Sequence, residues 1–379
     1  MKITVAIDSF KGSLNSIEAG NAAAEGIKRV YPDSVINVRP IADGGEGTTD
    51  AIATGLGGSL RTVKAHDALM REIDCTYAVA NRTAIIEMAA AAGLPQLKES
   101  ERNPLNTTTY GVGEMIADAL SIGCRDFVIG IGGSATNDGG VGMLSALGFR
   151  FTDKNGDPIS HGAGGLAALA NIDENGLLDG LSESRFRVAC DVTNPLCGSN
   201  GCSAVYGPQK GASPEAVQMM DGWLDAFAKL TKEKHKAADK SFPGAGAAGG
   251  MGFALREYLH GELVSGIKLI LDITNLEQYI KDSDIVITGE GRLDSQSAMG
   301  KAPAGVAALA KKHGKPCIAF AGAVSEDAGI CNTVGIDAFF PIRRRICTLE
   351  EALDKQNARR DLADTAEQVA RLIKSFCQI

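Results

Sequence analysis

One stretch, residues 126–140, constrains the fold of this chain more than any other part of its sequence. A short apolar run ends there in glycines, and Ser134, Thr136 and Asn137 follow before a sequence that can form a helix. This order predicts a buried strand, a tight glycine turn and a helix start. Glycine leaves backbone N–H groups open to an anion, and a helix start adds partial positive charge. The stretch predicts a phosphate-binding turn, although an ordinary strand-to-helix turn explains this one stretch equally well.

Glycine is also the unusual part of the composition. The 379 residues include 46 glycines, a larger share than the usual ~7%. They occur in clusters rather than in a repeat, which indicates many tight loops close to ligands. The remaining composition, 44% hydrophobic and 22% charged, is that of a soluble globular protein with enough residues for two domains.

Several classes of ligand and location are disfavoured by simple counts. A net charge of −8 argues against nucleic acid, which needs a basic footprint. Five scattered histidines and nine cysteines without a CxxC pair favour reduced thiols over a metal site. No segment approaches the ~20 apolar residues of a membrane span, and the first residues do not form a signal peptide. We therefore expect a cytoplasmic protein without membrane contact. Nothing in the sequence specifies an oligomeric state.

The order of strand-like segments predicts two α/β domains. Five such segments lie near the two ends of the chain, at 3–7, 34–38, 284–289, 316–322 and 337–342. Three more, between 60 and 88, are too close together for intervening helices, which indicates a mixed sheet. We predict a doubly wound domain from residues 1–59 and 265–379 and an inserted α/β domain of residues 60–264. The cleft between them is the expected binding site.

Two familiar nucleotide motifs were compared with the chain. The P-loop pattern fails, because Ser295 stands at its first glycine and Ala302 at its Ser or Thr. Gly130, Gly132 and Ala135 do satisfy a short dinucleotide fingerprint after a strand. An NAD-dependent hydroxy-acid dehydrogenase therefore stays open as an alternative, as does a non-catalytic ligand-binding protein.

The polar loops contain the residue types that phosphoryl transfer requires. That reaction needs cations around the phosphates, carboxylates for Mg²⁺ and a base near the acceptor hydroxyl. Lys11, Lys210 and Arg292 lie in glycine-flanked loops. Acidic residues stand at or just beyond predicted strand ends, namely Asp8, Asp43, Glu46, Asp191, Glu290 and Asp294. Any one of them could be a solvated loop acid, but six at such positions favour a catalytic site.

Seven motifs closely resemble those of bacterial glycerate kinases. They are DSFKGS at 8–13, PIADGGEGT at 40–48, IGIGGSATNDGG at 129–140, ACDVTNPLCG at 189–198, GPQKGA at 207–212, GAGAAGG at 244–250 and DIVITGEGRLDS at 284–295. The resemblance extends from residue 3 to about residue 375. It implies a flavodoxin-like domain beside a second α/β domain, which agrees with the split inferred from the strands.

The resemblance also implies an activity that spacing alone does not give. It implies ATP-dependent phosphorylation of D-glycerate with Mg²⁺. The chain resembles the branch that makes 2-phosphoglycerate during the breakdown of glyoxylate, glucarate and galactarate. Phosphorylation of the 3-hydroxyl by the same site is the alternative product.

Roles can be assigned to the loop residues on this basis. Asp191 is the expected general base, with metal binding as its rival role, and Lys11 is expected to act on the transferring phosphate. Asp43, Glu46 and Asp294 are the expected Mg²⁺ ligands. The predicted substrate- or phosphate-binding residues are Ser9, Gly132, Gly133, Ser134, Asn137, Lys210 and Arg292, whose guanidinium could hold the glycerate carboxylate.

Overall fold

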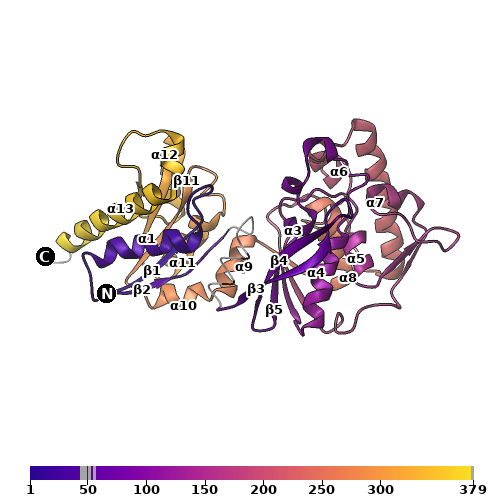
Figure 1. Ribbon diagram of the computed structural model, residues 1–379, viewed down its shortest axis with the longest axis horizontal. Helices are drawn as coiled ribbons and strands as arrows, with labels where there is room; N and C mark the ends of the chain where they lie inside the picture. Colours follow the sequence, from indigo (N-terminus) through magenta and orange to yellow (C-terminus); the bar gives the residue numbers. More distant parts are fainter. Residues whose placement is uncertain (43–48, 50–52, 54–56, 377–379) are drawn as a thin grey trace. The chain divides into compact units, whose positions relative to one another are not determined.

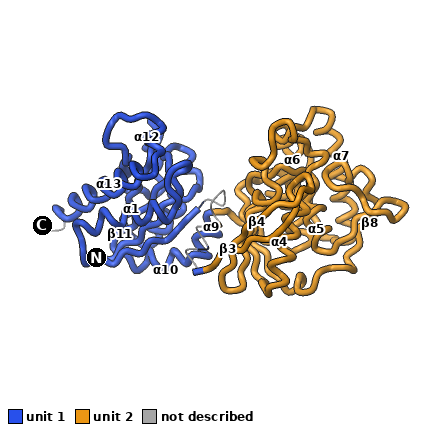
Figure 2. The backbone as a smooth tube through the Cα atoms, viewed as in Figure 1, with its two compact units in different colours: residues 1–43, 50–57, 267–379 blue, residues 44–49, 58–266 orange. Residues whose placement is uncertain are grey.

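The computed structural model describes the chain except residues 43–48, 50–52, 54–56 and 377–379. The described residues divide into two compact units (Figure 2). Unit 1 comprises residues 1–43, 50–57 and 267–379, and unit 2 comprises residues 44–49 and 58–266. Within the described residues, no helix has the length and apolar character needed to cross a membrane.

Unit 1 is built on a five-stranded parallel sheet with the order β13-β12-β11-β1-β2. The strands are β1 (Lys2–Ile7), β2 (Val35–Val38), β11 (Ile285–Leu293), β12 (Cys317–Val324) and β13 (Ala338–Pro341). Counted within the unit, this is the order 2-1-3-4-5 read from the other edge, which is that of flavodoxin-like sheets. The predicted fold class is therefore confirmed for the part built from both chain ends.

Helices cover both faces of this sheet (Figure 1). They are α1 (Ser16–Lys28), α9 (Gly266–Ile273), α10 (Leu276–Lys281), α11 (Ala302–Lys312), α12 (Leu349–Leu353) and α13 (Lys355–Phe376), with a 3-10 helix, η6, at Glu326–Val334. Alternate residues of β1, such as Val5, join the core formed with α1 and α13. Thr4 faces the other way, where its hydroxyl bonds to Ser283 and the Tyr279 carbonyl. This alternation is what a strand buried on both faces requires.

Two helices begin with reciprocal side-chain caps. The Asn15 side chain accepts the Glu18 N–H, and the Glu18 carboxylate accepts the Asn15 N–H. Thr348 and Glu351 form the same reciprocal pair at the start of α12. Each pair satisfies backbone donors that a helix start leaves open.

Unit 2 contains a six-stranded mixed sheet with the order β10-β9-β6-β5-β4-β3. The strands are β3 (Ser59–His66), β4 (Glu72–Ala80), β5 (Thr83–Glu87), β6 (Asp126–Gly130), β9 (Arg185–Ala189) and β10 (Glu262–Val264). The first three pair antiparallel, and β5, β6, β9 and β10 pair parallel. The predicted mixed sheet of the inserted part is therefore confirmed.

The helices of unit 2 surround this sheet. They are α3 (Ala89–Ala92), α4 (Tyr110–Ser121), α5 (Val141–Ala146), α6 (Cys202–Tyr206), α7 (Pro214–Lys234) and α8 (Met251–Leu259). The 3-10 helices are η1 (Leu94–Gln96), η2 (Glu99–Glu101), η3 (Ala163–Ala168), η4 (Pro208–Lys210) and η5 (Ala247–Gly250). A separate hairpin pairs β7 (Arg150–Thr152) with β8 (Asn171–Asp173).

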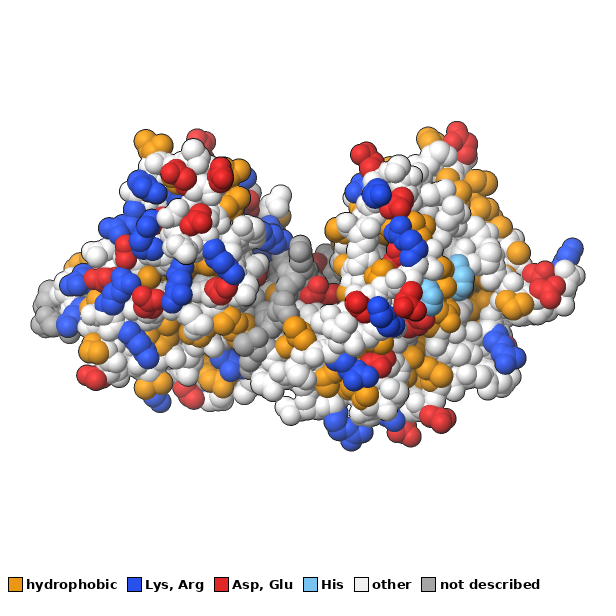
Figure 3. Space-filling view, viewed as in Figure 1, with side chains coloured by type: hydrophobic (Ala, Val, Ile, Leu, Met, Phe, Trp, Pro, Cys, Tyr) orange, Lys and Arg blue, Asp and Glu red, His pale blue; other side chains and the backbone are white. Residues whose placement is uncertain are grey.

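The register of β6 against β9 positions the loops that follow both strands. Phe127 is paired with Phe186, and their rings stack with centroids 4.7 Å apart. Both side chains are almost fully buried, and such a ring pair adds about 0.5–1.5 kcal/mol beyond area burial. The same register sets Gly130 opposite Ala189. The loops after these two strands therefore start side by side at one edge of the sheet. On the visible face of each unit, basic side chains are interspersed with acidic ones (Figure 3).

Candidate active site

The turn after β6 forms one wall of a pocket of about 270 Å³ in unit 2. Gly132, Gly133 and Ser134 all line it. Gly133 has φ +72°, a conformation that favours glycine. In the described part of the chain, no backbone acceptor is bonded to the N–H of Gly132 or Gly133. The turn can therefore offer backbone donors to an anion.

Lys210, at the end of η4, reaches this pocket from the interior. Its side chain is only 2% exposed, and its ammonium donates to Ser134 Oγ at 2.8 Å and to the Thr136 carbonyl at 2.7 Å. Burial lowers the pKa of Lys210 to about 8. No carboxylate of the described residues forms an ion pair with it. A buried ammonium without an adjacent counter-charge favours binding of an oxyanion.

Asn137 lies in the same loop but outside this pocket. Its amide nitrogen donates to Ser203 Oγ at 2.8 Å, and its side chain is fully buried. The backbone next to it is in close contact with a second glycine-rich segment, because a Cβ on Gly249 would come within 2.1 Å of the Thr136 carbonyl oxygen. The structure therefore separates the Asn137 side chain from Ser134 and gives it a contact inside unit 2.

The other walls include residues that the sequence did not single out. Cys190, Val192, Tyr206 and Gln209 line the pocket together with Ala248. The Tyr206 hydroxyl donates to Asn194 Oδ1 at 2.6 Å. Their sequence signal was weak, because all of them lie within or beside the recognised motifs but none is a residue type that predicts phosphate chemistry. Ala248 has φ +53°, a strained conformation for a residue with a side chain.

Asp191 stands close to this pocket in the chain but is not among the residues that line it. Its neighbours Cys190 and Val192 do line it. Asp191 is exposed, and its Oδ1 accepts the backbone N–H of Gly266 at 3.0 Å. Gly266 is the last residue of unit 2 and the first of α9. This contact gives Asp191 a structural role that competes with the predicted role as base.

Ser9 and Lys11 lie at the point where the strand order of unit 1 reverses. The Asp8 N–H donates to the Gly289 carbonyl at 2.9 Å, and a Cβ on Gly291 would lie 3.4 Å from the Lys11 backbone nitrogen. The loops after β1 and along the end of β11 are therefore adjacent. In flavodoxin-like sheets, ligands bind outside the carboxyl ends of the strands at this switch point. The Lys11 side chain is exposed there.

Arg292 and Asp294 lie at the carboxyl end of β11. The Arg292 side chain is 70% exposed and its Nε donates to Ser325 Oγ at 3.1 Å. Asp294 Oδ1 accepts the backbone N–H groups of Gln296 and Ser297, as a turn-forming aspartate does. Asp294 Oδ2 lies 3.7 Å from Arg292 Nε. The contacts of Asp294 are therefore those of a turn residue paired with a cation.

The predicted metal ligands do not form a set among the described residues. Asp43 and Glu46 lie outside them, and no described group of three or more His, Cys, Asp or Glu side chains is arranged to hold a metal ion. Thr49 is described, and its N–H and hydroxyl donate to a Glu87 carboxylate oxygen at 2.7 and 2.9 Å. The described residues therefore do not assemble the predicted Mg²⁺ site by themselves.

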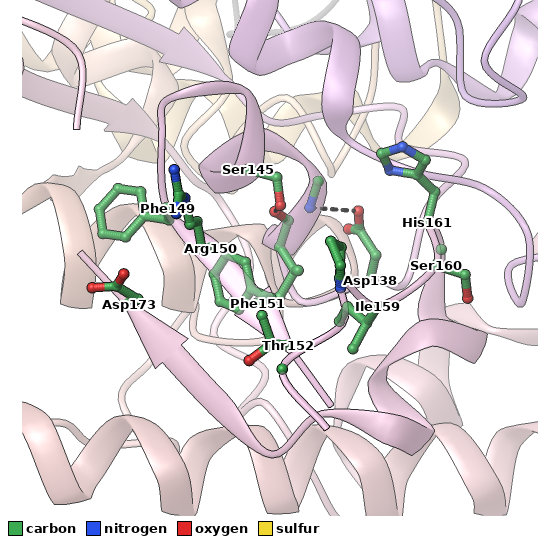
Figure 4. A pocket seen from close by; sticks show the side chains of 15 residues that line it. Asp138, Ser145, Phe149, Arg150, Phe151, Thr152, Ile159, Ser160, His161 and Asp173 are labelled. Atoms are coloured by element: carbon green, nitrogen blue, oxygen red, sulfur yellow. Dashed lines mark hydrogen bonds between the residues drawn. The ribbon is translucent and has the colours of Figure 1, made fainter. Parts of the chain in front are cut away.

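A larger pocket, of about 520 Å³, lies elsewhere in unit 2 (Figure 4). Asp138 and Gly142 line it together with residues of α5, β7 and the loop after β7. None of the described residues predicted for the site lines it. The smaller pocket is the better candidate despite its size, because it combines a glycine turn with a buried ammonium.

Comparisons with known proteins give one consistent result. The sequence profile of the glycerate kinase family matches residues 3–374. The chain is 46% identical to the glycerate 2-kinase of Escherichia coli over 354 residues, which is 93% of each chain. It is 45% identical to the glycerate kinase of Haemophilus influenzae over 375 residues, which is 98% of this chain and 99% of that one. A crystal structure from Salmonella typhimurium LT2, of a protein assigned as glycerate kinase 2, has a TM-score of 0.93 and 44% identity, with both chains fully covered.

Proposed function

Because the chain belongs to the glycerate kinase family and is thus an enzyme that phosphorylates glycerate, we propose that it uses ATP as donor and the 2-hydroxyl of D-glycerate as acceptor. The products would be 2-phospho-D-glycerate and ADP. The proposed position rests on the E. coli relative, which is named a glycerate 2-kinase. We also propose that the reaction serves the breakdown of glyoxylate, glucarate or galactarate.

One observation supports this function best: the pocket beside the turn after β6 contains a buried ammonium and open backbone donors. Both reactants carry oxyanions, since glycerate has a carboxylate and ATP has phosphates. A volume of about 270 Å³ is below the usual ~300–1,000 Å³ of pockets for drug-sized ligands. The pocket therefore suits a three-carbon acid or one phosphoryl group better than a whole nucleotide.

The described residues can be given the following actions. Lys210, Ser134 and the N–H groups of Gly132 and Gly133 would hold an oxyanion and stabilise negative charge. When bound, ATP would supply the phosphoryl group and Mg²⁺ would neutralise charge on its phosphates, with Asp43, Glu46 and Asp294 as the proposed ligands. Lys11 and Ser9, at the switch point of unit 1, are proposed to bind phosphate, and Arg292 the glycerate carboxylate.

Asp191 is proposed as the general base that accepts the proton of the glycerate hydroxyl. Its exposure and its position next to two pocket-lining residues support this role. The Gly266 contact occupies one of its two carboxylate oxygens. The other oxygen is the one that we assign to proton transfer.

The test of this function is a single assay with product identification. Protein, ATP, Mg²⁺ and D-glycerate are mixed, ADP formation is followed, and the product is examined by phosphorus NMR. We expect ADP release that depends on D-glycerate and one resonance from 2-phosphoglycerate. A 3-phosphoglycerate resonance would overturn the assigned position, and the absence of ADP would overturn the choice of donor.

A further inference from the structure

Asp138 is a buried carboxylate to which the sequence assigned no role. It is 1% exposed and follows Asn137 in the loop between β6 and α5. One wall of the larger pocket contains it, and Figure 4 shows its carboxylate beside the backbone at the start of α5. In the described part of the chain no Lys, Arg or His forms an ion pair with it. A buried charge without an ion-pair partner needs compensation from elsewhere.

Hydrogen bonds provide part of that compensation. Oδ2 accepts the Thr109 N–H at 2.8 Å, the Thr109 hydroxyl at 2.9 Å, the Gly142 N–H at 3.2 Å and the Thr108 hydroxyl at 3.3 Å. Oδ1 accepts the Gly140 N–H at 3.1 Å. The carboxylate thereby joins the start of α4 to the loop after β6.

A second contact strengthens this connection. Thr107, Thr108 and Thr109 are fully buried, and the Thr107 hydroxyl donates to the Ala135 carbonyl at 2.8 Å. Ala135 lies between Ser134 and Thr136, which are the two residues that accept hydrogen bonds from Lys210. The three threonines and Asp138 therefore hold the segment that positions the Lys210 ammonium.

Asp138 also acts on Lys210 through its charge. The two groups that raise the pKa of Lys210, against the larger effect of burial, are Cys202 and Asp138. Burial raises the pKa of the Cys202 thiol to about 11, and burial likewise raises the pKa of the pocket-lining Cys190 and Tyr206. These three groups are neutral at neutral pH. Of the two groups that act on Lys210 through charge, Asp138 is thus the one that supplies negative charge at neutral pH.

We propose that Asp138 is a positioning residue for phosphoryl transfer, a buried carboxylate that fixes the loop after β6 and whose negative charge stabilises the Lys210 ammonium for contact with a substrate oxyanion. The proposal rests on the proposed function, because it needs Lys210 to bind glycerate or phosphate. It goes further by naming a residue that does not touch the ligand.

Calorimetry of D-glycerate binding tests this proposal without requiring turnover. Titrations in buffers of different ionisation enthalpy report proton uptake on binding. We expect wild-type binding to weaken above about pH 8 and to take up a proton there, since an oxyanion stabilises the ammonium. In Asp138→Asn the onset of both effects should move to lower pH, so the affinity at about pH 8 should fall severalfold.

Thr109→Val is the matched control, because it removes a hydrogen bond to Asp138 but keeps the charge. It should destabilise the loop after β6 without changing the pH at which proton uptake begins. The proposal would be overturned if proton uptake began at the same pH in wild type and Asp138→Asn. It would also be overturned if both variants shifted that pH equally. A second titration uses inorganic phosphate. If the wild type binds neither glycerate nor phosphate, the result would count against the proposed role of the pocket.

A second variant keeps the proposal testable if Asp138→Asn alone does not fold. The double variant Asp138→Asn/Lys210→Met removes both buried charges, so it should fold, and Lys210→Met should raise the melting temperature more in the Asp138→Asn background than in the wild type. A double variant that stays unfolded, or a rise no larger than in the wild type, would show that the two charges are not coupled and would leave Asp138 with a purely structural role.

Discussion

The two units hold their candidate cations in opposite ways. In unit 1, Lys11 is exposed and the Arg292 side chain is 70% exposed. In unit 2, Lys210 is 2% exposed and its ammonium is fixed by two hydrogen bonds of 2.7–2.8 Å. All three follow or adjoin glycine in similar loops. The sequence context is alike, but the physical environments differ.

This difference determines what each cation can contribute. An exposed ion pair is worth about 0–1 kcal/mol and is screened by salt. A buried ammonium interacts much more strongly with a bound anion, but its own burial is unfavourable until that anion arrives. We therefore expect unit 2 to provide the preorganised anion site and unit 1 to provide weaker, salt-sensitive contacts.

Asp191 gives the largest expected effect, and it tests whether an exposed residue of unit 2 can be essential. Asp191→Asn should lower kcat by at least about a hundredfold, as loss of a general base does, while ATP binding survives. The amide oxygen can still accept the Gly266 N–H, so the structural contact is retained. Steady-state kinetics and nucleotide titration measure both quantities.

Asp191→Ala is the companion variant, since it removes the base and the Gly266 contact together. If Asp191 acts as a base, both variants should be similarly inactive. Near-normal turnover of Asp191→Asn beside a defective Asp191→Ala would assign the residue to the link with α9 instead.

Lys210→Met should lower kcat/KM for glycerate phosphorylation by about a hundredfold, because loss of a buried charge-assisted contact costs about 2–3 kcal/mol. The melting temperature should stay the same or rise, because the variant removes a buried charge from the free enzyme. Steady-state kinetics check the loss of kcat/KM, and thermal unfolding checks the melting temperature. Lower activity together with a lower melting temperature would indicate that Lys210 mainly holds Ser134 and Thr136 in place.

The pH dependence follows from the lowered pKa of Lys210. Burial lowers the pKa of the Lys210 ammonium from 10.5 to about 8, so the ammonium is present below about pH 8 and is lost as the pH rises through that value. kcat/KM should therefore fall about tenfold per unit above that pH. A profile of kcat/KM between about pH 6 and 10 measures this fall. A kcat/KM that stays constant on the basic side of the profile would contradict the role of the ammonium.

Lys11→Ala and Arg292→Ala should have the smallest effects, about three- to tenfold in kcat/KM, which corresponds to about 1 kcal/mol. Because these side chains are exposed, the difference from wild type should shrink as salt is added. Activity measured at low and high ionic strength provides the check. If either variant lost a hundredfold in kcat/KM and this loss did not depend on salt, the contrast between the two units would not hold.

Much of the fold could be predicted from the sequence, because the signals are local. Apolar runs such as residues 3–7 and 284–289 are typical of strands buried on both faces, and the reciprocal Asn15–Glu18 pair marks a helix start. Helix α4 begins at Tyr110 and does not extend back over the polar residues 107–109. The three threonines before it are instead used for contacts with the loop after β6.

The candidate site was less predictable, because burial depends on contacts between distant segments. The glycines beside Lys210 suggested an accessible loop, yet its ammonium reaches inward to Ser134, 76 residues away in the chain. Asn137 and Ser134 lie three residues apart but point to different surroundings. A carboxylate before two glycines, as at Asp138, is typical of a turn. Its donors instead come from the threonines before α4, from Gly140 and from Gly142 of α5.

The central claim is that the Lys210 ammonium receives an oxyanion of a reactant, and a crystal structure with bound D-glycerate tests it most directly. We expect an oxyanion oxygen of a reactant in the pocket beside Gly132 and Gly133, about 2.8 Å from Lys210 Nζ. A second crystal with a phosphate analogue distinguishes the carboxylate from a phosphoryl group at that position. Glycerate and the phosphate analogue both bound elsewhere, with this pocket holding only water, would contradict the account.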